Sequence, residues 1–179
     1  MKPILLIAVA TLCFAASEPI VSLNSIRTVE AAINDKVRSN ISDPYDLLGP
    51  ARGTYVDGYG TVFTVELNLV LVSPLNISPF KPSLTEEEIA SLHSRKARKV
   101  DALRETMRGL MIDASKALPG LPPEEHIVLE AFLFNYRWEQ ARGLPRRLVL
   151  TATKQKLLDA ANRHVSGREL ASLFEEQEL

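Results

Sequence analysis

The residues best suited to chemistry are polar and aromatic side chains that recur at every second position of three apolar segments, 61–72, 126–136 and 147–153. They are Thr64, Glu66 and Asn68 in the first, Glu130, Phe132, Phe134 and Tyr136 in the second, and Thr151 and Thr153 in the third. Because successive side chains of a strand point to opposite faces, each set lies on one side of its strand. A face that mixes aromatic and polar groups fits a ligand groove or a partner surface. The favoured interpretation is nevertheless a face that the N-terminal helix half covers, and the register that decides between the two is not fixed by the sequence.

Signatures of catalysis and of metal binding are absent from the sequence. The histidines, His93, His126 and His164, belong to no His-Glu-x-x-His pair, and no Gly-x-Ser-x-Gly elbow is present. His126 and Glu130 share a face of a strand, but they would be about 13 Å apart, which is too far to chelate one ion. We therefore expect no metal and no cofactor. Carboxylates such as Glu66 and Glu130 are the remaining candidates for a hydrolytic site.

The glycine-rich stretch RGTYVDGYGTVF, residues 52–63, has two possible interpretations. A phosphate-binding loop needs its glycines between a strand and a helix, followed by Gly-Lys-Ser/Thr. Here the glycines lead into the alternating strand 61–72, so a β-hairpin is favoured. Asp57-Gly58 is a preferred pair for a two-residue type I′ turn. Gly60 then suits a bulge or a close approach of another backbone.

The N-terminal residues 1–17, MKPILLIAVATLCFAAS, have the pattern of a secretory signal peptide. One lysine precedes a short apolar run and then small residues, and the run is shorter than the roughly 20 residues of a membrane-spanning helix. We expect an exported, periplasmic or extracellular protein, with membrane association only if this segment is not cleaved. The single cysteine, Cys13, lies within it, which excludes disulfides from the mature chain. The formal net charge of −1 argues against nucleic acid as a partner.

The remaining sequence predicts an α+β domain. A helix over 25–40 presents Ile26, Val29, Ile33 and Val37 as one stripe, with Asn24 or Ser25 as its N-cap. Strands 53–56 and 61–72 precede a long helix that begins at Thr85 with Glu88 in a capping box. Strands 126–136 and 147–153 follow, then a helix over 154–164 and a short one capped by Ser166. We expect a four-stranded, mainly antiparallel sheet with helices packed mostly on one face, and a frayed helical end at Glu175, Glu176 and Glu178. The predicted organisation is a signal peptide (1–17), an N-terminal helix and linker (18–50), and one α+β domain (51–179).

Two further features are ambiguous. The basic run HSRKARK, 93–99, could contact anionic lipid or an acidic partner, although such a run is more often a solvated helix face. Asn40-Ile41-Ser42 and Asn76-Ile77-Ser78 match the glycosylation sequon, which matters only in a eukaryotic secretory route.

The predicted function is therefore that of an exported, non-enzymatic binding or assembly module, with a protein partner or self-association. The alternative is a cofactor-free extracytoplasmic hydrolase that uses carboxylates on the open sheet face. The sequence favours the first because it lacks a nucleophile elbow, a nucleotide loop and a metal cluster.

Overall fold

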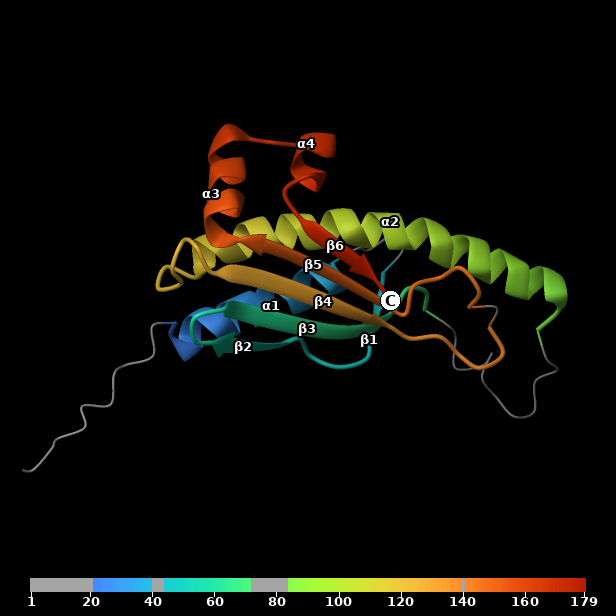
Figure 1. Cartoon of the computed structure of the whole chain (residues 1–179). Helices are drawn as coiled ribbons and strands as arrows, with labels where there is room; N and C mark the ends of the chain where they lie inside the picture. The colour runs from blue at the N-terminus through green and yellow to red at the C-terminus, as the bar shows by residue number, and fades with distance from the viewer. Residues whose placement is uncertain (1–20, 40–43, 72–83, 140) are drawn as a thin grey trace, which may run out of the picture.

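The computed structural model describes residues 21–39, 44–71, 84–139 and 141–179 and shows a mixed α+β fold (Figure 1). The strands are β1 (Asp46–Leu47), β2 (Arg52–Val56), β3 (Gly60–Asn68), β4 (His126–Leu133), β5 (Arg147–Thr153) and β6 (Glu175–Glu178). The helices are α1 (Leu23–Arg38), α2 (Glu86–Ala117), α3 (Lys154–Arg163) and α4 (Gly167–Ala171). The predicted signal peptide and both sequons involve residues outside the described ranges. In the described part of the chain, no helix combines the length and the apolar character that crossing a membrane requires.

The sheet has six strands, in the order β1–β3–β4–β5–β6 with β2 also paired to β3. The β3–β4 pair is parallel, because the long helix α2 returns the chain to the edge at which β3 began. The other pairs are antiparallel. The four expected strands are present, but the expected four-stranded sheet is too small. The prediction missed β1, which is only two residues long, and β6, which has no alternating apolar residues.

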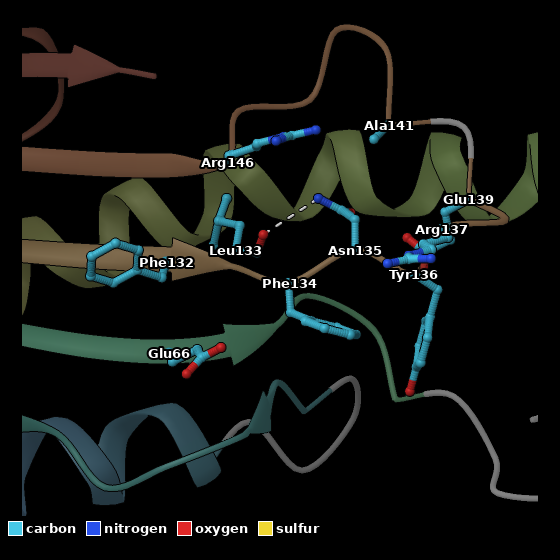
Figure 2. A pocket seen from close by; sticks show the side chains of 10 residues that line it. All are labelled: Glu66, Phe132, Leu133, Phe134, Asn135, Tyr136, Arg137, Glu139, Ala141 and Arg146. Atoms are coloured by element: carbon cyan, nitrogen blue, oxygen red, sulfur yellow. Dashed lines mark hydrogen bonds between the residues drawn. The ribbon is translucent and has the colours of Figure 1, made fainter.

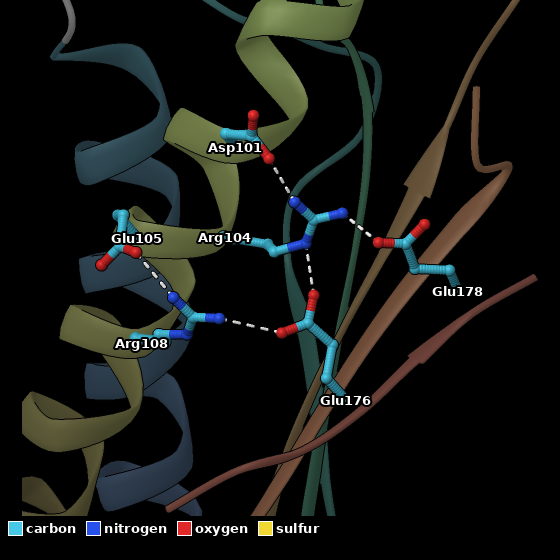
Figure 3. A network of polar contacts seen from close by, with 6 residues as sticks. All are labelled: Asp101, Arg104, Glu105, Arg108, Glu176 and Glu178. Carbon is cyan, nitrogen blue, oxygen red and sulfur yellow. Dashed lines mark hydrogen bonds and ion pairs between the residues drawn. The ribbon is translucent and has the colours of Figure 1, made fainter. Parts of the chain in front are cut away.

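The C-terminal strand β6 replaces the frayed helical end that the sequence suggested. Glu176 and Glu178 pair in register with the buried Leu150 and Leu148, so their side chains lie on the helix side of the sheet. There they form ion pairs with arginines of α2, Arg104 and Arg108 (Figure 3). The carboxylates that looked unfavourable at the end of a helix are thus neutralised by cations from a different element.

The stretch between β2 and β3 is a tight turn, as predicted. Tyr59 donates its backbone N–H to the carbonyl of Val56 at 3.0 Å. The turn type was wrong, because Gly58 (φ 71°) has positive φ and Asp57 does not, whereas a type I′ turn needs positive φ at both. Gly60 has φ 136°, and a Cβ built on it would lie 1.9 Å from the carbonyl oxygen of His126. The expected close approach is therefore confirmed, and it is what allows β4 to pair there.

Helices α1 and α2 pack on the same face of the sheet (Figure 1). The predicted stripe of α1 is confirmed as buried, although the N-cap is Ser22, whose side chain accepts from the N–H of Ser25. A Cβ on Gly53 would meet both Phe63 and Ile26, which places α1 against the core side of β2 and β3. Glu30 and Asn34 of α1 also accept the backbone N–H groups of Gly53 and Ala51. The favoured interpretation, in which this helix half covers the opposite face, is therefore wrong.

The long helix α2 begins as predicted, with Thr85 and Glu88 forming both bonds of a capping box. Its apolar stripe, interrupted in the sequence at Lys96, is buried along most of its length. The side chain at the interruption is buried as well, since Lys96 is 0% exposed. Strand β3 ends earlier than expected. Asn68 and Val70 are both buried and Leu71 is 53% exposed, so the period-two alternation stops at Asn68.

Candidate functional site

One face of the sheet is turned away from α1 and α2, and most of the predicted site residues lie on it. The register pairs Thr64 with Glu130 and Glu66 with Phe132 across β3 and β4. Thr151 and Thr153 of β5 lie on the same side, because the alternate residues Leu150 and Ala152 are in the core. The structure therefore brings together six of the nine predicted residues, which are Thr64, Glu66, Glu130, Phe132, Thr151 and Thr153.

The other three predicted residues, Asn68, Phe134 and Tyr136, are not part of this uncovered strand surface. Asn68 is 1% exposed, and its side-chain oxygen accepts from the N–H of Val70 at 3.4 Å. Strand β4 ends at Leu133, so Phe134 and Tyr136 belong to the connection that leads to β5. The predicted strand 126–136 was therefore too long. Aromatic residues favour strand conformation, but this preference does not show whether a neighbouring strand is there to pair with them.

The connection after β4 holds an aromatic cluster. The rings of Phe134 and Tyr136 meet edge to face with centroids 4.9 Å apart, and those of Tyr136 and Trp138 stack at 5.2 Å. Together with Phe132 at the end of β4, they form what we call the aromatic corner. Burial raises the pKa of Tyr136, and the negative charges of Asp46 and Glu139 add to this effect. Phe132, Phe134 and Trp138 are each 37% exposed, which is high for side chains of this size.

A buried lysine from α2 holds this corner in place. The ammonium group of Lys96 donates to the carbonyl of Phe134 at 3.2 Å, to the side-chain oxygen of Asn135 at 2.9 Å, and to the carboxylate of Glu139. Burial lowers the pKa of Lys96, and the hydrogen bond and charge of Glu139 oppose that shift. All three acceptors lie in one segment of six residues, so Lys96 holds the aromatic corner through one backbone carbonyl and two side chains.

A cavity of about 510 Å³ opens beside the aromatic corner (Figure 2). Its lining comes from the end of β3, the end of β4 and both ends of the following connection. The lining residues are Glu66, Phe132, Leu133, Phe134, Asn135, Tyr136, Arg137, Glu139, Ala141 and Arg146. Its volume is within the range of about 300–1,000 Å³ that is usual for small-ligand sites.

The charges around this cavity are unevenly satisfied. Glu139 is paired with Lys96, but its second oxygen, Oε1, is buried without a hydrogen-bond partner among the described residues. Arg137 and Arg146 form no ion pair or side-chain hydrogen bond within the described part of the chain. Glu66 is exposed at the mouth of the cavity. The cavity thus offers two guanidinium groups to an incoming ligand.

Glu66 and Glu130, the carboxylates expected for a hydrolytic site, are not both free of ion pairs. Glu130 forms an ion pair with Arg147 at 3.0 Å, and the Arg147 guanidinium lies 5.0 Å from the ring centroid of Phe132. Glu66 pairs with Phe132, two residues further along each strand than the pair formed by Thr64 and Glu130. The hydrolase alternative stays a prediction.

A second polar cluster lies at the opposite end of the parallel strand pair. The hydroxyl of Tyr55 is 3.2 Å from Oε1 of Glu125 and 3.4 Å from Oδ1 of Asp57. Burial raises the pKa of Tyr55, and the two carboxylates raise it further. Tyr59 stacks on His126 next to this cluster, with centroids 5.3 Å apart. The hydroxyl can donate to only one of these two carboxylates at a time. The hydrogen bond to Glu125 ties the hairpin to the start of β4.

The basic run 93–99 is not a continuous charged surface. Lys96 and Lys99 are both buried, and Lys99 donates to the carbonyl of Pro44 at 3.0 Å and lies over the ring of Tyr45. Nε2–H of His93 donates to the carbonyl of Arg142 at 3.0 Å. Within the ranges that the structure describes, no group of three His, Cys, Asp or Glu residues could hold a metal ion.

Sequence reasoning did not identify Lys96, Trp138, Glu139, Arg137 or Arg146 as residues of one site. The signal that was available is the gap at Lys96 in an otherwise regular apolar stripe. A long cationic side chain at a core position requires a buried acceptor, and a carboxylate is the usual one.

Comparison of the chain with protein-family models, with curated proteins and with solved structures finds no match.

Proposed function

We propose that this protein is an exported, non-enzymatic binding module that engages its partner at the aromatic corner and the adjoining uncovered sheet face. The observation that supports this most is the position of Phe132, Phe134 and Trp138. Each is more than a third exposed. Phe132 and Phe134 line the cavity at one end of the sheet, and Trp138 stacks on Tyr136, which lines it as well. Aromatic side chains that are rigid and exposed are typical of the centres of binding surfaces.

The helices strengthen the argument through what they leave uncovered. Helices α1 and α2 bury one face of the sheet, and the opposite face retains Val62 and Val149 among threonines and charged residues. A mixed surface of this kind resembles a non-obligate interface more closely than an obligate, apolar one. A partner that binds and leaves, either another protein or a second copy of this chain, fits this composition.

The partner surface can be tested by placing a photo-crosslinking amino acid, p-benzoylphenylalanine, at single positions in the full-length protein in its native host. We expect crosslinks to one discrete species from Thr64 on the uncovered face and from Phe134 in the aromatic corner. The matched control is Asp113, which is exposed on α2 on the other side of the sheet. Equal crosslinking from all three positions, or from Asp113 alone, would contradict the proposal.

The proposed export is tested separately. The mature protein is expected to begin between Ala16 and Glu18, because small residues follow the short apolar run. N-terminal sequencing of the protein isolated from the extracytoplasmic fraction decides this, and a chain that still begins at Met1 would favour an anchored protein instead.

A further inference from the structure

The two arginines of the cavity define the charge of the ligand that it can hold. Arg137 and Arg146 lie in different parts of the β4–β5 connection, nine positions apart in the sequence, yet both line the same cavity (Figure 2). Neither is neutralised by a carboxylate in the described part of the chain, unlike Arg104, Arg108 and Arg147. A guanidinium presents a planar set of donors that matches a carboxylate, so a cavity with two of them is suited to an anion.

The segments that hold these arginines are fixed by backbone hydrogen bonds. The backbone carbonyl of Arg146 accepts from the N–H of Leu133 at 2.9 Å, and the backbone N–H of Arg146 donates to the carbonyl of Leu179 at 2.7 Å. On the other side of the cavity, the N–H of Phe134 donates to the carbonyl of Leu67 at 2.9 Å. Together with the anchor at Lys96, these bonds order the walls before any ligand arrives, which reduces the entropy cost of binding.

The remaining lining residues restrict the rest of the ligand. Phe132, Phe134 and Tyr136 supply aromatic surface, which favours an apolar or aromatic body. Glu66 is exposed at the same cavity and forms no ion pair in the described ranges, so a second negative charge on the ligand would meet repulsion there. Glu139 contributes little repulsion, because its carboxylate is compensated by Lys96.

We infer that the cavity binds a monocarboxylate with an aromatic or apolar body, whose carboxylate is held by Arg137 and Arg146. This inference rests on the proposed function, since it names the chemistry that the aromatic corner recognises. The carboxylate could belong to a small free acid or to the C-terminus of a peptide, and the chemistry at the two arginines is the same.

The test uses the single tryptophan of the chain, Trp138, which stacks on a lining residue and therefore reports on the cavity. Full-length mature protein is titrated with phenylacetate while tryptophan fluorescence is recorded with excitation at 295 nm. We expect a saturable change with phenylacetate and none with phenylacetamide, its neutral counterpart. Arg137→Met and Arg146→Met should each weaken binding at least about tenfold, since each removes one charged hydrogen-bonding partner.

Two matched variants sharpen the result. Arg27→Met, on the exposed side of α1, should leave the affinity unchanged, and Glu66→Gln should tighten binding of phenylacetate a few-fold by removing the repulsive charge. Circular dichroism of each variant establishes that it is folded. Since Glu66→Gln is expected to improve binding, its effect cannot be explained by loss of structure.

The source of the carboxylate is distinguished by comparing phenylacetate with the tripeptide Gly-Gly-Phe and its C-terminal amide. Tighter binding of the free tripeptide than of phenylacetate assigns the site to a chain terminus, and the reverse assigns it to a small acid. The inference is overturned if phenylacetate gives no saturable signal, if phenylacetamide or inorganic phosphate binds equally well, or if the arginine variants bind like the wild type. Any of those results together with persistent crosslinking from Thr64 would remove this inference and leave the proposed function standing.

Discussion

Replacing Lys96 by methionine is expected to destabilise the fold and to loosen the aromatic corner in particular. The lysine side chain is 0% exposed and that of Glu139 is 3% exposed, so the variant leaves a carboxylate buried without its cation. It also removes the donor to the carbonyl of Phe134 and to the amide oxygen of Asn135. Methionine matches the lysine stem in length, so little of the loss comes from packing.

The expected magnitude follows from these contacts. Breaking a buried ion pair by removing one partner costs about 3–5 kcal/mol, because the remaining charge is uncompensated. In the double variant Lys96→Met with Glu139→Met, no charge is left behind, and replacing both partners of a buried pair is often close to neutral. The double variant should therefore be more stable than Lys96→Met alone by at least about 2 kcal/mol, which is the signature of direct coupling.

Urea denaturation followed by far-ultraviolet circular dichroism measures the global free energy of unfolding, and Trp138 fluorescence measures the corner. We expect the fluorescence of the Lys96→Met variant to resemble that of a solvated tryptophan at urea concentrations where the helices persist. Arg98→Met is the control, because Arg98 is exposed on the same helix and surface changes of this kind usually alter stability by less than about 0.5 kcal/mol. A loss of less than about 1 kcal/mol for Lys96→Met, or a double variant no more stable than the single one, would refute the anchoring role.

Three further changes test the architecture. Gly60→Ala should lower the free energy of unfolding by about 3 kcal/mol or more, because the added Cβ would lie 1.9 Å from the carbonyl oxygen of His126. Gly58→Ala should lower it by about 1 kcal/mol, because no atom lies within 4 Å of the added Cβ and only the positive φ is unfavourable. Equal urea midpoints for the two variants would contradict this. Arg108→Met combined with Arg104→Met should raise hydrogen exchange in β6 at least tenfold while the exchange of β4 is unchanged, and unaltered β6 exchange would show that the ion pairs do not hold it. Lys154→Met should lower the free energy of unfolding by about 1–3 kcal/mol by orphaning the carbonyls of Leu118 and Leu121. Burial lowers the pKa of Lys154 in the folded protein. Between that lowered value and the ordinary value near 10.5, the unfolded chain binds more protons than the folded one, so the free energy of unfolding rises with pH. This rise from pH 7 to 10 should be smaller in Lys154→Met, and parallel plots of stability against pH for the variant and the wild type would refute the sign.

The elements that the sequence predicted well are those with a strong local signal. The stripe of α1 and the capping box at Thr85 are set by residues within a few turns of one another, and both are confirmed. The hairpin turn was correctly located because glycine at positive φ is a local requirement, although its type depends on Asp57 and was wrong. Strand β6 was missed because its sequence, Glu-Glu-Gln-Glu, has no preference for a strand until β5 and the arginines of α2 lie beside it.

The candidate site divides in the same way. The alternation of side chains on β3, β4 and β5 could be predicted from the sequence, because the period of two is a property of each strand alone. Three features could not be predicted in this way: α1 joins α2 on one face, Phe134 and Tyr136 lie beyond the strand, and Arg137 and Arg146 line one cavity. These facts depend on register, on the packing side of each helix, and on contacts such as Lys96 with Glu139 between residues 43 positions apart. No local pattern encodes them, because the free energy that selects them arises only when distant segments bury their charges and apolar surface together.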